Sequence, residues 1–272
     1  MKKKTTKKSA AKTALCVGIN NYPGTANDLS GCVNDAKDWK KELERRGFKV
    51  ELLLDSQATA DAIRAALEDK VRSAVKGDTV VFTYSGHGSW LPDDDGDEVD
   101  GRDEMICPYD VGQGGAVMDD DLHEIFRQRA QGVKLVFISD SCHSGTVSKM
   151  LRPPAEVGKS YARPRFLHPK VFVKSKKMLK AIDRVVALSK TPQAKYPALL
   201  AAGCKDTEYS WDATFGGRAN GAFTYFALKT LAAKPKSYTS WMKAVRTKLP
   251  STAHPQSPSL YGNSFSKSWS VL

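Results

Sequence analysis

The chain has 272 residues, of which 41% are apolar, so it can bury one large hydrophobic core or two small ones. It contains no apolar run of 18 residues, which argues against a membrane-spanning helix, and no signal-peptide-like apolar segment follows its basic N-terminus. Five cysteines without disulfide or zinc spacing are typical of reduced thiols, so we expect a cytoplasmic protein.

The formal net charge is +12, which often indicates an acidic partner such as nucleic acid or a membrane surface. Here the positive charges gather in residues 1–12 and 151–190, whereas residues 93–121 are strongly acidic. Because the basic residues do not share one face with aromatic side chains, we expect no nucleic-acid partner. Residues 1–12 are predicted to form a disordered basic tail.

Strand and helix patterns alternate along the rest of the chain. Strands are predicted at 13–19, 48–54, 78–83, 133–138 and 196–202, and helices at 34–46, 59–75, 120–130, 221–233 and 238–249. This order predicts an α/β fold with a mostly parallel central sheet sandwiched by helices. We expect a single domain at 13–272, with a larger part at 13–150, a basic surface loop at 151–190 and a smaller part at 191–272.

A histidine and a cysteine each lie in a Gly/Ser-rich turn directly after a predicted buried strand. His87 follows the strand at 78–83, and Cys142 follows the strand at 133–138. Since the carboxyl ends of parallel strands share one edge of a sheet, both turns are expected to open there. A thiol needs a nearby imidazole or a helix N-terminus to hold its thiolate form. The pattern therefore predicts a catalytic Cys142–His87 pair.

The backbone N–H groups of Gly88 and Cys142 are expected to bind the oxyanion of an acyl-transfer intermediate. Two simpler interpretations stay open, because a buried cysteine is often core filling and a Gly-His-Gly triplet can be only a tight turn. Adjacent residues of an extended chain point to opposite sides, so Cys142 and His143 are not expected to share a zinc ion.

The motifs themselves resemble the caspase-like clan, and most closely its metacaspases, including the bacterial orthocaspase-like members. The matching segments are 29–36 (LSGCVNDA), 84–88 (YSGHG), 95–101 (DGDEVDG), 107–110 (CPYD), 140–145 (DSCHSG) and 221–225 (GAFTY). His87 precedes Cys142 by 55 residues, close to the separation of roughly 50 found in caspases. The resemblance implies the caspase-like fold, with His87 as base and Cys142 as nucleophile.

Metacaspases cut after arginine or lysine, and the residues that match their substrate pocket are Cys32, Asp35, Ser85 and Asp140. Carboxylates such as Asp35 and Asp140 can pair with a guanidinium or an ammonium group, in agreement with that specificity. Asp35 can alternatively serve only as a favourable charge in the first turn of its helix.

The acidic stretch resembles the segment in which many metacaspases bind activating Ca²⁺, and the matching positions are Asp103, Asp119 and Asp120. The chain departs from that pattern after the nucleophile, where Lys149 stands in a segment without an acid. A solvated loop is the alternative, with Asp119 as a cap of the helix that follows. We expect no other cofactor.

Residues 151–190 lie where related enzymes are processed, so the resemblance implies self-cleavage there, although an uncut surface loop is equally compatible with the composition. The sequence thus predicts a monomeric cysteine endopeptidase acting on proteins or peptides after Arg or Lys. A transpeptidase using the same acyl-thioester, or an idle interaction module with the same fold, are the alternatives.

Overall fold

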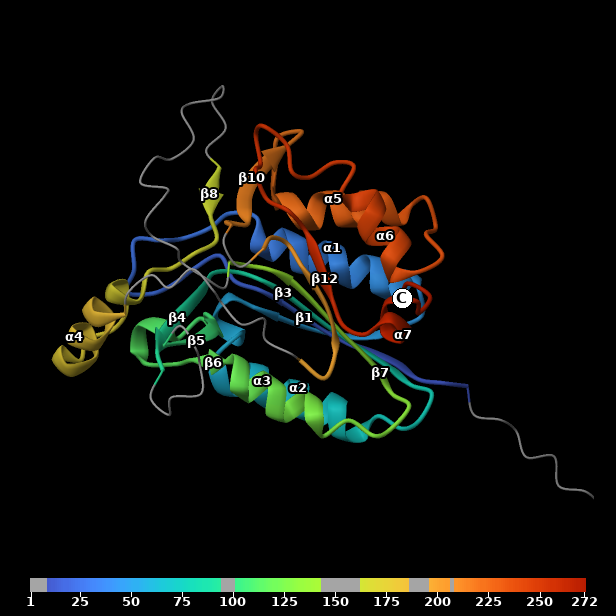
Figure 1. Cartoon of the computed structure of the whole chain (residues 1–272), viewed down its shortest axis with the longest axis horizontal. Coiled ribbons are helices and arrows are strands. Elements are labelled where there is room, and N and C mark those ends of the chain that lie inside the picture. Colours follow the sequence, from blue (N-terminus) through green and yellow to red (C-terminus); the bar gives the residue numbers. More distant parts are fainter. Residues whose placement is uncertain (1–8, 94–100, 143–161, 186–195, 206–207) are drawn as a thin grey trace, which may run out of the picture.

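The computed structural model describes residues 9–93, 101–142, 162–185, 196–205 and 208–272. Its centre is a six-stranded sheet with the strand order β12-β9-β7-β3-β1-β2 (Figure 1). The strands are β1 (Lys12–Gly18), β2 (Lys49–Leu54), β3 (Thr79–Ser85), β7 (Lys134–Asp140), β9 (Leu199–Ala202) and β12 (Ser259–Tyr261). The first five run parallel to their neighbours, and β12 runs antiparallel to β9. The predicted parallel sheet is confirmed.

Helices cover both faces of this sheet, with α1, α5 and α6 on one side and α2 and α3 on the other (Figure 1). The helices are α1 (Cys32–Arg45), α2 (Ala60–Ser73), α3 (Asp119–Arg127), α4 (Lys176–Arg184), α5 (Ala222–Leu231), α6 (Tyr238–Val245) and α7 (Ser264–Lys267). In the part of the chain that the structure describes, three short 3₁₀ turns occur at Asp55–Gln57, Val111–Gln113 and Pro169–Val171. Within the described residues, no helix has the length and apolar character needed to cross a membrane.

The two-residue alternation of the strands explains this layering. In β1, Leu15 and Val17 belong to the core beneath α2 and α3, whereas Ala14 and Cys16 belong to the core beneath α1. The strands β3 and β7 divide their side chains in the same way. Because both faces are covered, the strands read as continuous apolar runs, which is why they are predictable from the sequence.

Two small three-stranded sheets lie beside the central one and were not predicted. One contains β4 (Gly88–Pro92), β5 (Arg102–Ile106) and β6 (Val117–Met118), and the other contains β8 (Arg163–Pro164), β10 (Trp211–Phe215) and β11 (Arg218–Gly221). Acidic residues are depleted in strands, so the acidic composition around β5 gave no strand signal.

The basic connecting loop differs from its prediction in the part that the structure describes, residues 162–185. Helix α4 forms there, capped by the Ser175 side chain, and β8 is exposed, but two residues that follow β8 are not on the surface. Arg165 and Leu167 are completely buried. Residues 1–8 of the predicted tail and the remaining parts of the loop lie outside the described residues, and Lys12, predicted to close the tail, begins β1.

Candidate active site

The turns that follow β3 and β7 meet at the carboxyl edge of the central sheet. Ser85, the last residue of β3, is paired in register with Asp140, the last residue of β7. His87 lies two residues after Ser85, and Cys142 lies two residues after Asp140. A Cβ atom on Gly88 would lie 1.8 Å from the carbonyl oxygen of Cys142, so only glycine permits this approach. The two turns therefore touch, at the edge where the sequence predicts them.

The His87 ring is held in one tautomer by a carbonyl group. Its Nε2 lies 2.6 Å from the carbonyl oxygen of Asn27, which can only accept, so Nε2 carries the proton. The Nδ1 atom of the neutral ring then has a free lone pair, and this buried atom makes no hydrogen bond within the described part of the chain. Burial lowers the pKa of His87 to about 4, so the ring is neutral near pH 7.

The Cys142 sulfur is completely buried and accepts a hydrogen bond from the backbone N–H of Ser210 at 2.8 Å. In the described ranges of the chain, no hydrogen bond joins this sulfur to the His87 ring. The two residues are instead brought together around a third group, the backbone carbonyl of Arg165.

Arg165, which directly follows β8, places its carbonyl oxygen between the two turns. This oxygen accepts hydrogen bonds from the N–H of Gly88 at 3.0 Å and from the N–H of Cys142 at 3.2 Å. These are the two backbone groups that are expected from the sequence to bind an oxyanion. The N–H of Arg165 donates to the carbonyl of Ser210 at 2.9 Å, so the same backbone is fixed on its other side.

The Arg165 side chain fills an acidic pocket beneath this carbonyl. Its Nη2 lies 2.7 Å from Asp35 Oδ2 and 2.9 Å from Asp212 Oδ1, and its Nη1 lies 3.2 Å from Asp140 Oδ2. Nη1 also donates to Ser85 Oγ at 3.3 Å. The guanidinium therefore contacts three carboxylates, all of them shielded from solvent.

The four residues expected from the resemblance to form the pocket do come together there. Asp35, Ser85 and Asp140 contact the guanidinium directly, while Cys32 is a completely buried residue at the start of α1. Burial raises the pKa of the Cys32 thiol, the charge of Arg165 lowers it, and the pocket carboxylates raise it further. Asp35 also lies in the first turn of α1, so its position is compatible with both of its interpretations.

Asp212 completes the pocket and was not predicted from the sequence. It lies in β10, and its carboxylate accepts hydrogen bonds from the N–H groups of Ser30 and Gly31, at 2.8 and 3.0 Å. These N–H groups directly precede α1, which Asn20 caps through its side-chain oxygen. Asp212 is a single aspartate in a short strand and belongs to no recognisable motif, so the sequence gives no indication of its role.

The pocket carries more negative charge than its one guanidinium neutralises. Burial and the neighbouring charge of Asp140 raise the pKa of Asp35 to about 7, although Arg165 opposes the shift. Hydrogen-bond donors from the surrounding backbone and side chains hold the carboxylates in place: Ser210, Asn220, Gly221 and Thr224. The site is therefore arranged to receive a cation.

The positions expected to bind calcium lie away from this pocket. Asp103 is in β5, and Asp119 and Asp120 begin α3. The backbone N–H of Met118, the N-cap residue of α3, donates to the carboxylate of Asp121. Across the described ranges, no three or more His, Cys, Asp or Glu side chains are grouped to hold a metal ion. Since residues 94–100 and Lys149 lie outside the described residues, calcium binding stays a prediction.

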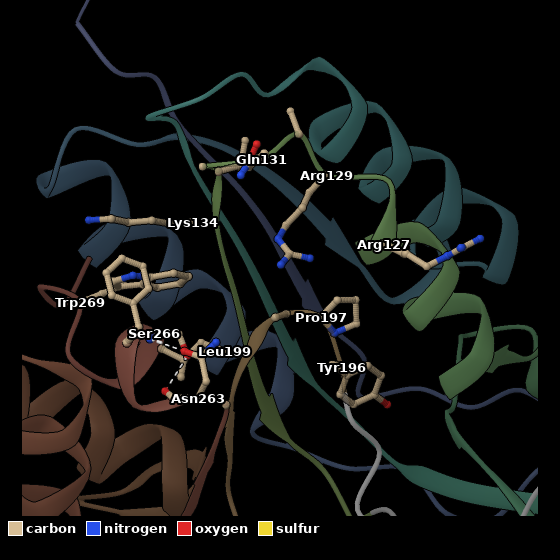
Figure 2. A pocket seen from close by; sticks show the side chains of 16 residues that line it. Arg127, Arg129, Gln131, Lys134, Tyr196, Pro197, Leu199, Asn263, Ser266 and Trp269 are labelled. Atoms are coloured by element: carbon tan, nitrogen blue, oxygen red, sulfur yellow. Dashed lines mark hydrogen bonds between the residues drawn. The ribbon is translucent and has the colours of Figure 1, made fainter.

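A separate cavity of about 600 Å³ lies at the opposite edge of the sheet, where β7 and β9 begin (Figure 2). Arg129, Lys134, Tyr196 and Trp269 are among its lining residues. Among the described residues that line it, none belongs to the predicted site. The chemistry is therefore expected at the carboxyl edge, around Arg165.

Comparison with known proteins agrees with the fold. The family model described as the caspase domain matches residues 11–269. The chain is 35% identical over 272 residues to Metacaspase-1 of Cryptococcus neoformans, an alignment that covers 88% of this chain and 59% of the relative. The chain thus spans about three fifths of that relative's length.

Solved structures give the same result. A crystal structure of a protein from Geobacter sulfurreducens has a TM-score of 0.72 and 31% identity, covering 94% of this chain and 97% of that one. Caspase-1 from Spodoptera frugiperda shares the fold, with a TM-score of 0.58 at 12% identity, over 94% of this chain and 87% of that one. The chain belongs to the caspase-domain family, as a metacaspase-like member.

Proposed function

We propose that this chain is a cysteine endopeptidase that cleaves proteins or peptides after arginine and, less well, after lysine. The observation that carries the proposal is the position of Arg165. Its side chain pairs with three buried carboxylates while its carbonyl oxygen accepts two backbone N–H bonds beside Cys142. A substrate arginine bound in the same way would present its carbonyl carbon to the sulfur.

The chemistry follows from this placement. The Cys142 thiol gives its proton to Nδ1 of His87, and the sulfur attacks the carbonyl carbon of the substrate arginine. The N–H groups of Gly88 and Cys142 stabilise the negative oxygen that forms. His87 then donates the proton to the leaving amine as the peptide C–N bond breaks. Water hydrolyses the resulting thioester and regenerates the thiol.

The pocket geometry favours arginine over lysine. The guanidinium meets Asp35 and Asp212 through one nitrogen and Asp140 through the other, a fork that an ammonium group cannot reproduce. A lysine ammonium keeps the charge but satisfies fewer of these carboxylates. A substrate aspartate in the pocket would add a fourth negative charge, so we expect no cleavage after aspartate.

The test uses fluorogenic reporters built on Arg-Pro-X, because Arg163 and Pro164 precede Arg165 in the chain itself. X is arginine, lysine or aspartate, each measured with and without calcium, and the Cys142→Ala variant is the control. We expect the fastest turnover after arginine, slower turnover after lysine, none after aspartate, and none of any kind in the variant. Turnover after aspartate but not arginine would overturn the pocket assignment.

Two further arms address the remaining expectations. Added glycinamide, as an amine acceptor, separates hydrolysis from transpeptidation by the mass of the product. A calcium titration tests the activation that the resemblance implies. A folded chain with no turnover under any of these conditions, either unmodified or with the Arg165→Gln change that empties the pocket, would favour the idle interaction module.

A further inference from the structure

The chain that leads into Arg165 is bound as an added β-strand. Arg163–Pro164 form β8, which pairs antiparallel with β10 through Asp212↔Arg163 and Trp211↔Pro164. The ladder continues with the bond from the Arg165 N–H to the Ser210 carbonyl. Arg163 also donates to the carbonyl of Asp28 at 2.9 Å. Peptide ligands commonly bind to a free sheet edge in this way.

The chain that leaves Arg165 is bound as well. Phe166 forms a parallel bridge with Gly88, and the N–H of Leu167 donates to the Gly88 carbonyl at 3.0 Å. The Ser89 hydroxyl donates to the Leu167 carbonyl at 2.6 Å, and the Leu167 side chain is completely buried in the core. The backbone on both sides of the Arg165–Phe166 bond is therefore fixed.

With this segment in place, the reactive groups are closed to outside molecules. Cys142 is completely buried and His87 is 2% exposed, although a protease needs both at a surface that a second chain can reach. The segment supplies the arginine, the carbonyl and the strand pairing that a substrate would supply.

We infer that residues 163–167 are a built-in, substrate-like inhibitor, and that their release from the cleft switches on cleavage of other proteins. The inference rests on the proposed function, since it assigns regulation to the same site. A ligand on the same chain acts at a high effective concentration, so it outcompetes dilute substrates. The apparent affinity for an outside substrate then falls in proportion to the fraction of molecules with an open cleft.

The anchoring beyond Arg165 explains how the bound segment can persist uncut. If the Cys142 sulfur bonds to the Arg165 carbonyl carbon, the bond to Phe166 nitrogen breaks and His87 supplies the proton to that nitrogen. The new amino group stays beside the thioester, because Leu167 remains bonded to Gly88 and Ser89. It can therefore attack the thioester and restore the peptide bond, returning the thiol its proton, before water enters.

The experiment measures access to Cys142 in the full chain with two alkylating reagents, and mass spectrometry of digests assigns the label. Iodoacetamide needs only an open path to the sulfur, whereas an arginine chloromethyl ketone also needs the acidic pocket. The remaining cysteines, all buried, serve as internal references. Arg165→Gln removes the charge that anchors the segment, and Arg184→Gln makes the same change at an exposed position of α4.

We expect Arg165→Gln to raise the rate of Cys142 alkylation by iodoacetamide about tenfold or more, with Arg184→Gln matching the unmodified chain. Leu167→Ala, which leaves the acidic pocket intact, should shift the rate in the same direction and serves if Arg165→Gln fails to fold. An equal rate in the folded variants, or fast alkylation of Cys142 in the unmodified chain, would overturn the inference.

The two reagents separate this inference from the proposed function. Faster alkylation by iodoacetamide, but not by the chloromethyl ketone, would support a covering segment over a site that does not select arginine. If the unmodified chain cleaves arginine reporters and the variants change neither alkylation rate, the proposed function stands and the inhibitor is excluded.

Discussion

Asp212 offers the sharpest test of how the pocket recognises a cation. Its carboxylate is 4% exposed, lies 2.9 Å from the guanidinium and accepts the N–H groups of Ser30 and Gly31. In Asp212→Asn the size is kept, but the charge is lost and one acceptor becomes an NH₂ group. That NH₂ group would face either the two backbone N–H donors or the guanidinium. Since all of these groups donate hydrogen bonds, no hydrogen bond could form there.

Removing one partner of a buried charged pair costs about 2–5 kcal/mol. Taking about 3 kcal/mol for this contact, and 1.4 kcal/mol for each tenfold change, gives a loss of about 100-fold in kcat/KM for an arginine substrate. The loss should be much smaller for citrulline, which has nearly the same shape as arginine but no charge. The expected signature is therefore a change in the arginine-to-citrulline ratio.

The assay compares Arg-Pro-Arg and Arg-Pro-citrulline reporters on one enzyme preparation. The built-in segment competes equally with both, so the ratio of their kcat/KM values does not depend on how many molecules are open. Asp61→Asn is the matched control, since that carboxylate is exposed and forms an ion pair with the half-buried Arg64, outside the pocket. An unchanged ratio in a folded Asp212→Asn protein would refute the charge argument.

Three further outcomes follow from the same geometry. Gly88→Ala places a Cβ 1.8 Å from the Cys142 carbonyl oxygen, so kcat should fall about 100-fold or more as the two N–H donors separate, and full activity in a folded variant would contradict the assigned donors. Burial lowers the pKa of His87 from 6.5 to about 4, so its contribution to stability is complete above pH 6.5 and lost as the pH falls toward 4. The free energy of unfolding should fall by about 3 kcal/mol between pH 6.5 and pH 4. Urea unfolding at these two pH values should show this fall in the unmodified chain but not in His87→Gln. Because the pKa of Asp35 is raised to about 7, the arginine-to-citrulline ratio of kcat/KM should fall as the pH falls from 8 to 6, and Asp35→Asn should flatten that profile.

The central sheet and its helices were predictable because their signals are local. Apolar runs such as that ending at Ile138, and helix patterns such as that around Trp39, fix element type without tertiary information. Parallel strands then place their carboxyl ends at one edge, which brought His87 and Cys142 together in the prediction. The motifs supplied Asp35, Ser85 and Asp140 through resemblance to a family.

The occupant of the pocket could not be predicted for a different reason. Arg165 lies in a stretch crowded with lysine and arginine and with weak periodicity, where any basic residue could equally have reached the carboxylates. Its selection depends on β8 pairing with β10 and on Leu167 entering the core, contacts between segments far apart in the sequence. Asp212 was missed for the same reason, since its role exists only once β10 lies beside α1.

The charges of the pocket argue that the cluster around Arg165 serves recognition and not stability. Buried ion pairs are weak contributors to folding, because desolvation offsets much of their attraction. A cluster arranged for stability would match its charges, whereas three carboxylates here face one guanidinium, and the pKa of Asp35 is raised to about 7. When the arginine leaves, the repulsion among the carboxylates remains, so the empty pocket favours the entry of another cation. The same excess charge that holds the built-in segment would therefore draw in the next substrate.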